Sequence, residues 1–368
     1  MKFRCERDAL VDRLTTASRA VSNRGGALPV LTGMHLSADG DTLTITGSDL
    51  DLTVRSTVTV AVDEPGVAVL PARLTVDIIR SLDGGAVEIE VAGDEAKISS
   101  GRSQFAVRTL PADDFPVLPE PSGDEVSLGA DALAGGLRQV VMAASSDDAR
   151  PILTGVLLSS EEGGLRLVAT DSYRLAVRDL PHATVLSEGQ KVLVPSRALG
   201  ELVRALGDAE EVTVRLGERD VTFDVPGSDG SVQVTTRLIE GEFPNYRQLI
   251  PSSYPNQLVV GREPLLEAVR RVKLMAREAA PLRVTQRSTG LELMAVTQDV
   301  GQAHEEVDAK YDGEELTVAF NPDYLIDGVD AAPGDEVVLE TVDALKPAVL
   351  RSTDGGDYLY LLMPVRVS

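Results

Sequence analysis

The sequence predicts an α+β fold in which three similar domains each pack two helices on antiparallel sheets. Short segments recur about 120 residues apart: residues 29–33 (PVLTG) match 151–155 (PILTG), and Phe115-Pro116 matches Phe243-Pro244. Most of each repeat alternates apolar and polar residues, as in 87–91, and this alternation is typical of half-buried antiparallel strands. A repeat of this length is the size of a small domain, not of a solenoid unit.

The predicted domains span residues 1–121, 125–251 and 256–368. The joints between them, 119–123 and 251–255, are rich in Pro and Ser, which is typical of linkers. The third copy is the weakest: it begins near Arg262 and places Ala319-Phe320-Asn321 where the second has Leu193-Val194-Pro195.

Each domain is predicted to open with an amphipathic helix and to contain a second helix before its last strands. The first helix begins near Arg7, and the second follows Pro71, a residue tolerated in a first helical turn. Apolar residues three or four positions apart define the helical faces. They are Leu10, Leu14, Ala17 and Val21; Leu74, Ile78, Ile79 and Leu82; Leu133, Leu137 and Val140; Leu199, Leu202, Val203 and Leu206; and Leu265, Leu266, Val269 and Val272. Predicted strands include 43–46, 87–91, 212–216 and 337–340.

Composition predicts a globular protein of the cytoplasm. Hydrophobic residues make up 43% and charged residues 25% of the chain, which excludes a disordered polymer. No apolar run approaches the ~20 residues of a membrane span, and the first residues show no secretory signal. The single cysteine, Cys5, fits a reducing compartment and is predicted to be a small buried residue.

The sequence offers few candidates for catalysis. His35, His182 and His304 lie far apart, and no hydrolase, nucleotide-binding or metal-ligand motif is present. We therefore predict a non-catalytic protein without cofactor or metal. A multidomain hydrolase that uses Asp49 or Asp171 is the alternative, although neither has a neighbouring base or nucleophile in the sequence.

The net charge of −23 argues against nucleic-acid binding if it is taken as a global sum. Binding depends on the local field, however, and arginines recur on the predicted helices while acidic residues collect on strands and loops. Aromatic residues are only 4%, so we expect any nucleic acid to be a duplex contacted through its phosphates. An ordinary solvated helix surface remains the alternative. The candidate DNA-facing residues are Arg24, Arg73, Arg80, Arg138, Arg150, Arg197 and Arg204.

Several segments resemble the bacterial DNA polymerase III beta subunit family, the replicative sliding clamps. They are 1–3 (MKF), 28–31 (LPVL), 46–50 (TGSDL), 100–103 (SGRS), 109–116 (TLPADDFP), 169–176 (ATDSYRLA) and 360–366 (YLLMPVR). The resemblance covers the whole chain in order, and residues 319–322 with 358–366 resemble the actinobacterial branch. The resemblance implies a head-to-tail homodimeric ring of six domains, in which the helices line a hole for duplex DNA. It also implies that the protein acts as a processivity factor.

The resemblance also implies a groove in which the polymerase III alpha subunit, the clamp loader and other partners dock short motifs of the Gln-x-x-Leu-Phe type. Many family members have Gly and His at the positions of Ser172 and Tyr173, and a basic residue at Gln248. Motif preference and inhibitor sensitivity therefore stay open, as does a second-copy paralogue with an altered pocket. The groove residues are Leu153, Thr170, Ser172, Tyr173, Arg174, Leu175, Pro244, Leu249, Asn321, Tyr324, Leu361, Leu362, Met363, Pro364, Val365 and Arg366.

Ring closure requires two unlike edges, because a head-to-tail contact joins different surfaces. One predicted edge is a basic to apolar strand around residue 105. The other combines Leu274 and Met275, predicted to lie on a helix, with an acidic strand near residue 305. Gln104 stands where some family members have Arg. The predicted interface residues are Arg102, Gln104, Phe105, Val107, Leu274, Met275, Glu305 and Glu306.

Overall fold

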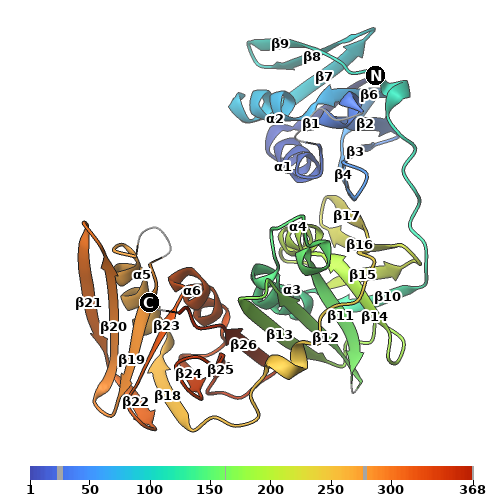
Figure 1. Cartoon of the computed structure of the whole chain (residues 1–368). Helices are drawn as coiled ribbons and strands as arrows, with labels where there is room; N and C mark the ends of the chain where they lie inside the picture. Colours follow the sequence, from blue (N-terminus) through green and yellow to red (C-terminus); the bar gives the residue numbers. More distant parts are fainter. Residues whose placement is uncertain (23–27, 162, 277–279, 367–368) are drawn as a thin grey trace. The chain divides into compact units, whose positions relative to one another are not determined.

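The computed structural model describes residues 1–22, 28–161, 163–276 and 280–366. Helices and antiparallel strands alternate along the chain (Figure 1), and two compact units form. Unit 1 comprises residues 1–134 and 197–238; unit 2 comprises 135–196 and 239–368. Among the described residues, no helix is long and apolar enough to cross a membrane.

Unit 1 contains two sheets, and every neighbouring pair of strands in them is antiparallel. The five-stranded sheet has the order β5 (Ala61–Glu64), β1 (Lys2–Glu6), β7 (Ala86–Ala92), β8 (Glu95–Ser100), β9 (Ser103–Arg108). The eight-stranded sheet has the order β10 (Glu125–Gly129), β15 (Glu211–Leu216), β16 (Asp220–Gly227), β17 (Gly230–Arg237), β4 (Leu52–Thr59), β3 (Thr42–Ser48), β2 (Gly33–Asp39), β6 (Gly66–Pro71). Its helices are α1 (Arg7–Ser18), α2 (Ala72–Ser81) and nearly all of α4 (Ser196–Leu206).

Unit 2 also contains two antiparallel sheets. The nine-stranded sheet has the order β14 (Lys191–Pro195), β11 (Gly155–Glu161), β12 (Gly164–Thr170), β13 (Arg174–Pro181), β26 (Tyr358–Leu362), β25 (Ala348–Ser352), β24 (Glu336–Thr341), β18 (Asn256–Gly261), β22 (Ala309–Asp312). The four-stranded sheet has the order β21 (Gly301–Val307), β20 (Gly290–Thr297), β19 (Leu282–Arg287), β23 (Leu316–Phe320). The helices are α5 (Arg262–Lys273), α6 (Pro322–Ala331) and the second half of α3 (Ala130–Val140).

Nearly all apolar-face residues of the predicted helices are buried in the cores, but Val203 is only partly buried and Leu74 is exposed. Leu10 and Leu14 of α1 are fully buried, as predicted, but Leu74 of α2 is 50% exposed. Helix α2 begins at Ala72 and buries Ala72, Thr75, Val76 and Ile79, the i, i+3, i+4, i+7 positions of one face. Leu74 is two residues, about 200°, away from Ala72 and therefore points to the opposite side.

Adjacent repeats share sheets. Strand β4 of the first repeat pairs with β17 of the second, with Val54 opposite Val234, and β13 of the second pairs with β26 of the third. Each repeat also has a strand before its first helix that the sequence pattern did not predict: β1, β10 and β18. In β1, Phe3 and Cys5 are buried, and burial raises the pKa of the Cys5 thiol to about 11.

Candidate functional site

A tight turn between β12 and β13 in unit 2 carries the first group of predicted groove residues. Asp171 accepts hydrogen bonds from the backbone N–H groups of Tyr173 (2.8 Å) and Arg174 (3.0 Å). The Thr170 hydroxyl donates to the Arg174 carbonyl (2.7 Å) and accepts from the Ser172 N–H (3.1 Å). Ser172 has φ = 81°, a left-handed conformation that favours glycine. The turn therefore holds Tyr173 outward in a fixed position.

Arg174 ties this turn to the helix α6 of the third repeat. Its guanidinium pairs with Asp171 (3.0 Å) and with Asp327, and it lies 4.3 Å from the centre of the Tyr324 ring. Burial raises the pKa of the Tyr324 hydroxyl. Arg174 is thus a structural cation between two carboxylates, and its partners Asp171 and Asp327 are residues that the groove prediction omitted.

Other predicted groove residues lie on the C-terminal stretch and at the start of α6. The Met363 N–H donates to the Tyr173 carbonyl (2.9 Å), and the Val365 N–H donates to the Ala319 carbonyl (2.8 Å). The Asn321 side chain caps α6 by accepting from the Asp323 and Tyr324 N–H groups. Backbone hydrogen bonds therefore hold residues 363–365 beside both the turn and the end of β23.

Strand alternation divides the predicted residues of β26 between two faces. Leu361 pairs with Leu175 and belongs, with partly buried Met363, to one apolar cluster. Leu362 is 1% exposed and falls on the opposite face, where the Tyr360 hydroxyl donates to the Tyr324 carbonyl of α6 (2.9 Å). Leu362 is therefore a core residue whose side chain lies on the face of β26 opposite to Leu361.

Exposed apolar side chains remain on the first face. Tyr173 is 60% and Leu249 43% exposed, and Pro244 is also exposed. Leu153 (in η4, Pro151–Thr154) and Leu175 are buried, while Arg366 is exposed at the end of the described chain. We call Tyr173, Pro244, Leu249, Met363 and Pro364 the candidate docking surface.

The two carboxylates of the hydrolase alternative are both occupied by structural contacts. Asp49 accepts from the Leu52 N–H (2.8 Å) and pairs with Arg197, just as Asp171 accepts from its own turn and pairs with Arg174. The residue that follows each aspartate, Leu50 or Ser172, has φ near 80°. Asp49 and Asp171 are equivalent turn residues of two repeats, which explains their presence without catalysis.

In unit 1, the candidate DNA-facing arginines differ in their availability. The Arg73 side chain is 98% exposed, with Asp77 at 4.0 Å, and Arg80 donates to the Thr15 hydroxyl (3.2 Å). Arg197 pairs with Asp49 and donates to the Arg19 carbonyl (3.1 Å), and Arg204 pairs with Glu201 (2.7 Å). Arg73 and Arg80 on α2 are thus freer to meet a phosphate than Arg197 and Arg204 on α4.

In unit 2, Arg138 on α3 is exposed and has no ion-pair partner in the part of the chain described. Arg150 pairs with Asp147 (3.0 Å) and donates to the Ser172 hydroxyl (3.2 Å), so it lies beside the docking turn. Arg24 lies outside the described residues.

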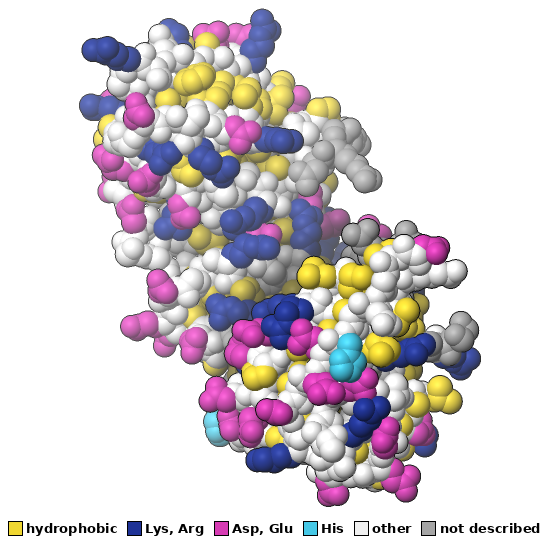
Figure 2. Space-filling model, turned by 90° about the vertical axis from the view of Figure 1, so that its left-hand side faces the viewer, with side chains coloured by type: hydrophobic (Ala, Val, Ile, Leu, Met, Phe, Trp, Pro, Cys, Tyr) yellow, Lys and Arg dark blue, Asp and Glu magenta, His cyan; other side chains and the backbone are white. Residues whose placement is uncertain are grey.

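The helices are less cationic than the sequence pattern predicts. Together α1 to α6 hold eleven basic and ten acidic residues, whereas the rest of the chain carries a net charge of −24. Helices α2 and α4 are each +1, and α6 is −3. On the face drawn in Figure 2, Lys and Arg lie interspersed with Asp and Glu. The acidic excess lies on strands and loops, and attraction for phosphate must come from individual unpaired arginines.

The predicted ring edges are free sheet edges. Strand β9 ends the five-stranded sheet of unit 1 and β21 ends the four-stranded sheet of unit 2. Phe105 on β9 is exposed and Val107 buried, and Arg102 and Gln104 are exposed. Leu274, 74% exposed, and Met275 lie just beyond α5 and not on it. As end strands, β9 and β21 each have one side whose backbone groups pair with no other strand of their sheet.

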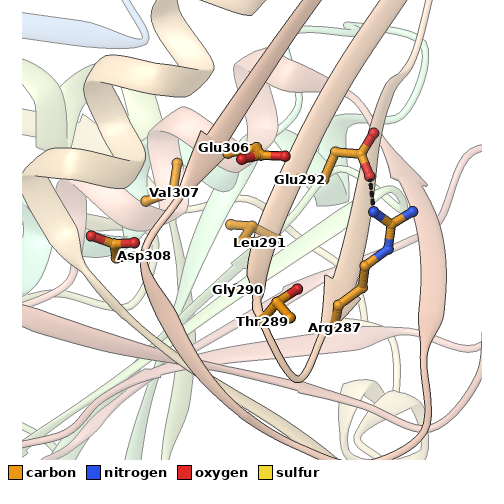
Figure 3. A pocket seen from close by; sticks show the side chains of 8 residues that line it. All are labelled: Arg287, Thr289, Gly290, Leu291, Glu292, Glu306, Val307 and Asp308. Atoms are coloured by element: carbon orange, nitrogen blue, oxygen red, sulfur yellow. Dashed lines mark ion pairs between the residues drawn. The ribbon is translucent and has the colours of Figure 1, made fainter.

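The acidic edge is partly neutralised within the chain. Arg271 donates to both oxygens of Glu305 (2.6 and 3.0 Å), and this hydrogen bonding lowers the pKa of Glu305. Glu306 is exposed and lines a cavity of about 280 Å³ (Figure 3), together with Glu292 and Asp308. The Arg287 guanidinium pairs with Glu292 there (2.7 Å). Within the described residues, no group of three or more His, Cys, Asp or Glu could hold a metal ion.

Comparison with known proteins decides the family. The N-terminal, central and C-terminal domain models of the DNA polymerase III beta subunit match residues 1–119, 127–245 and 247–366. The chain belongs to the DNA polymerase III beta subunit family. The beta sliding clamp of Streptomyces coelicolor is 34% identical over 378 residues, which cover all of both chains.

Solved clamps show the same fold. The DNA polymerase sliding clamp of Bacillus subtilis has a TM-score of 0.88 at 31% identity, and the sliding clamp of Bartonella birtlesii bound to griselimycin has 0.89 at 32%. Both cover 100% of each chain. The α+β architecture of three clamp domains is thereby confirmed, and so is the function of a sliding clamp, a non-catalytic processivity factor.

Proposed function

We propose that two copies of the chain close head to tail around duplex DNA and hold replication partners on the candidate docking surface. The domain limits 1–121, 125–251 and 256–368, the homodimer and the cytoplasmic location are parts of this proposal. The partners are a DNA polymerase III alpha subunit, a clamp loader and other proteins with motifs of the Gln-x-x-Leu-Phe type.

One observation carries the partner assignment: Tyr173 and Leu249 stay exposed although Leu175 and Ile250, close to them in the chain, belong to one apolar cluster. A polypeptide that covers them would remove apolar area from water at about 25 cal/mol per Å². The solved clamps of Pseudomonas aeruginosa and Bartonella birtlesii bound to griselimycin support a ligand-accepting surface in this family.

Ring closure is supported by the chemistry of the two edges. Strand β9 offers exposed Phe105, with exposed Arg102 in the turn just before it, while the other edge offers Leu274 and Glu306. When β9 of one copy pairs with β21 of another, apolar side chains would meet apolar side chains, and basic groups would meet acidic groups. Gln104 adds no ion pair to this contact.

Deletion of residues 363–368 tests the docking surface. It should abolish binding of a fluorescent Gln-x-x-Leu-Phe-type peptide and leave the dimer intact, because the ring edges are β9 and β21. Peptide titration and sizing of the same sample measure both. Unchanged peptide affinity would place the docking site elsewhere, and loss of the dimer would show that the stretch is structural.

Neighbouring residues of the C-terminal stretch provide a matched pair. Met363→Ala should weaken the peptide by about 1–3 kcal/mol, the usual scale for a central apolar contact. Leu362→Ala should instead lower the free energy of unfolding by about 2–5 kcal/mol, because Leu362 is buried on the opposite face. The reverse pattern would contradict the assignment of the two faces.

A further inference from the structure

A second cavity lies next to the candidate docking surface in unit 2. Its volume is about 430 Å³, and Val177 of β13 and Leu359 of β26 line it as opposite residues of the paired strands. Leu175 and Leu361 form the next pair on the same face, beneath the docking surface. Two residues along a strand correspond to about 7 Å. The cavity therefore continues the apolar row that underlies the docking surface.

The segment η5 (Tyr246–Leu249) borders both places. Tyr246, Arg247 and Ile250 line the cavity, while Leu249 belongs to the docking surface. Val177, Leu359, Tyr246 and Ile250 belong to the same apolar cluster as Leu175, Leu361 and Met363. A polypeptide on the docking surface would therefore need only a few more residues to reach the apolar side chains of the cavity.

Charged groups around the cavity are paired with one another. Arg166 donates to both oxygens of Asp179 (2.5 and 2.7 Å) and pairs with Glu161 (2.7 Å). Arg247 also pairs with Glu161, and Arg351 pairs with Glu340 (3.1 Å).

The balance of these charges selects the class of ligand. With Asp357, which also lines the cavity, four carboxylates surround three guanidinium groups. A small anion would therefore meet more carboxylates than cations and gain little. The N–H and C=O groups of a peptide backbone can bond to both kinds of group.

We propose that this cavity binds a second apolar side chain of the same partner polypeptide, two to four residues outside the motif on the docking surface. The proposal rests on the proposed function of that surface. An extended chain covers about 3.3 Å per residue. Two residues therefore span the distance of about 7 Å between the two apolar pairs, and up to two more allow the peptide to pass around η5. Partners with such a residue would bind more tightly than partners with the motif alone.

Titration with matched peptides tests the proposal. The short peptide carries the Gln-x-x-Leu-Phe-type motif alone; long peptides carry six more residues at one end or the other, with either Leu or Ala at the second to fourth added positions. At one end, the Leu peptide should bind about ten-fold more tightly than its Ala counterpart, the scale expected for burial of one Leu side chain. A Leu advantage below about two-fold at both ends would overturn the proposal.

Variants localise the effect. Val177→Phe fills the cavity and should remove the Leu advantage while the short peptide binds as before. Val67→Phe, at an exposed position of β6 in unit 1, is the matched control and should change neither. An advantage that survives Val177→Phe would overturn the proposal. If Val177→Phe does not fold, the comparison of Leu and Ala peptides on the unmodified protein decides alone. Failure of the short peptide itself would overturn the docking surface and this inference with it, whereas short-peptide binding without a Leu advantage would overturn this inference alone.

Discussion

The helix pairs α1/α2 and α5/α6 hold equivalent places in the first and third repeats but arrange their charges differently. On α2, Arg73 projects freely and Arg80 contacts a hydroxyl. On α5, Arg270 pairs with Asp330 of α6 (3.2 Å), and Lys273 pairs with Asp323. Helix α2 of the first pair leaves its cations available, whereas the third pair neutralises Arg270 and Lys273 internally.

This difference separates what the repeat needs for folding from what it needs for DNA. Buried positions such as Leu14 of α1 and Leu266 of α5 are apolar in both pairs, because packing requires it. Exposed positions are free to differ, so repeats with one architecture can differ in their attraction for phosphate. Attraction for DNA should therefore depend on α2 more than on the α5/α6 pair.

The largest expected effect is common to the two helix pairs. Leu14→Ala and Leu266→Ala should each lower the free energy of unfolding by about 2–5 kcal/mol, because both side chains are fully buried. Denaturant melts of each variant measure this. A large cost at one site and none at the other would show that the repeats do not share their packing.

The charge difference is tested by reversal on α2. Arg73→Glu with Arg80→Glu should weaken the equilibrium affinity of the protein for duplex DNA by more than about ten-fold near 0.1 M salt, since each lost phosphate contact also lowers the salt slope by about 0.9. Lys191→Glu with Arg219→Glu, two exposed residues away from the helices, is the control of equal charge. Equal loss in both variants would mean that only net charge matters.

Neutralising α6 should have a smaller and opposite effect. Asp323→Asn with Asp330→Asn frees Lys273 and Arg270 and should raise the affinity for duplex DNA about two- to three-fold in the same assay. A loss as large as that of the α2 reversal would contradict the assignment of α2 as the stronger DNA-facing helix.

The smallest expected effect concerns Leu74. Because this side chain is half exposed on α2, Leu74→Ala should cost less than about 1 kcal/mol of unfolding free energy. A cost close to that of Leu14→Ala would mean that Leu74 lies on the packed face of the helix, as apolar spacing alone predicts.

The sequence predicts the helices well where their apolar spacing matches one face, as with Leu10 and Leu14. It misplaces Leu74 because apolar spacing alone does not show which face of α2 packs, and that face includes the small or polar residues Ala72 and Thr75. The alternation of β26 already implies that Leu361 and Leu362 point apart, although the family resemblance assigned both to the groove.

Contacts between distant residues explain what the sequence could not predict. Arg174 and Asp327 are 153 residues apart, and Lys273 and Asp323 are 50 apart. Their pairing depends on how β13 meets β26 and how α5 packs on α6. The cavity beside the docking surface likewise arises only when η5 lies against the nine-stranded sheet.

Retention of the loaded protein on circular and linear DNA tests the central claim most directly. Protein loaded on a nicked circle should stay bound after free protein is removed at a salt concentration that disrupts simple phosphate contacts. Cutting the same circle once should release it, because a ring slides off a free end. Equal retention before and after the cut would contradict a clamp that encircles DNA.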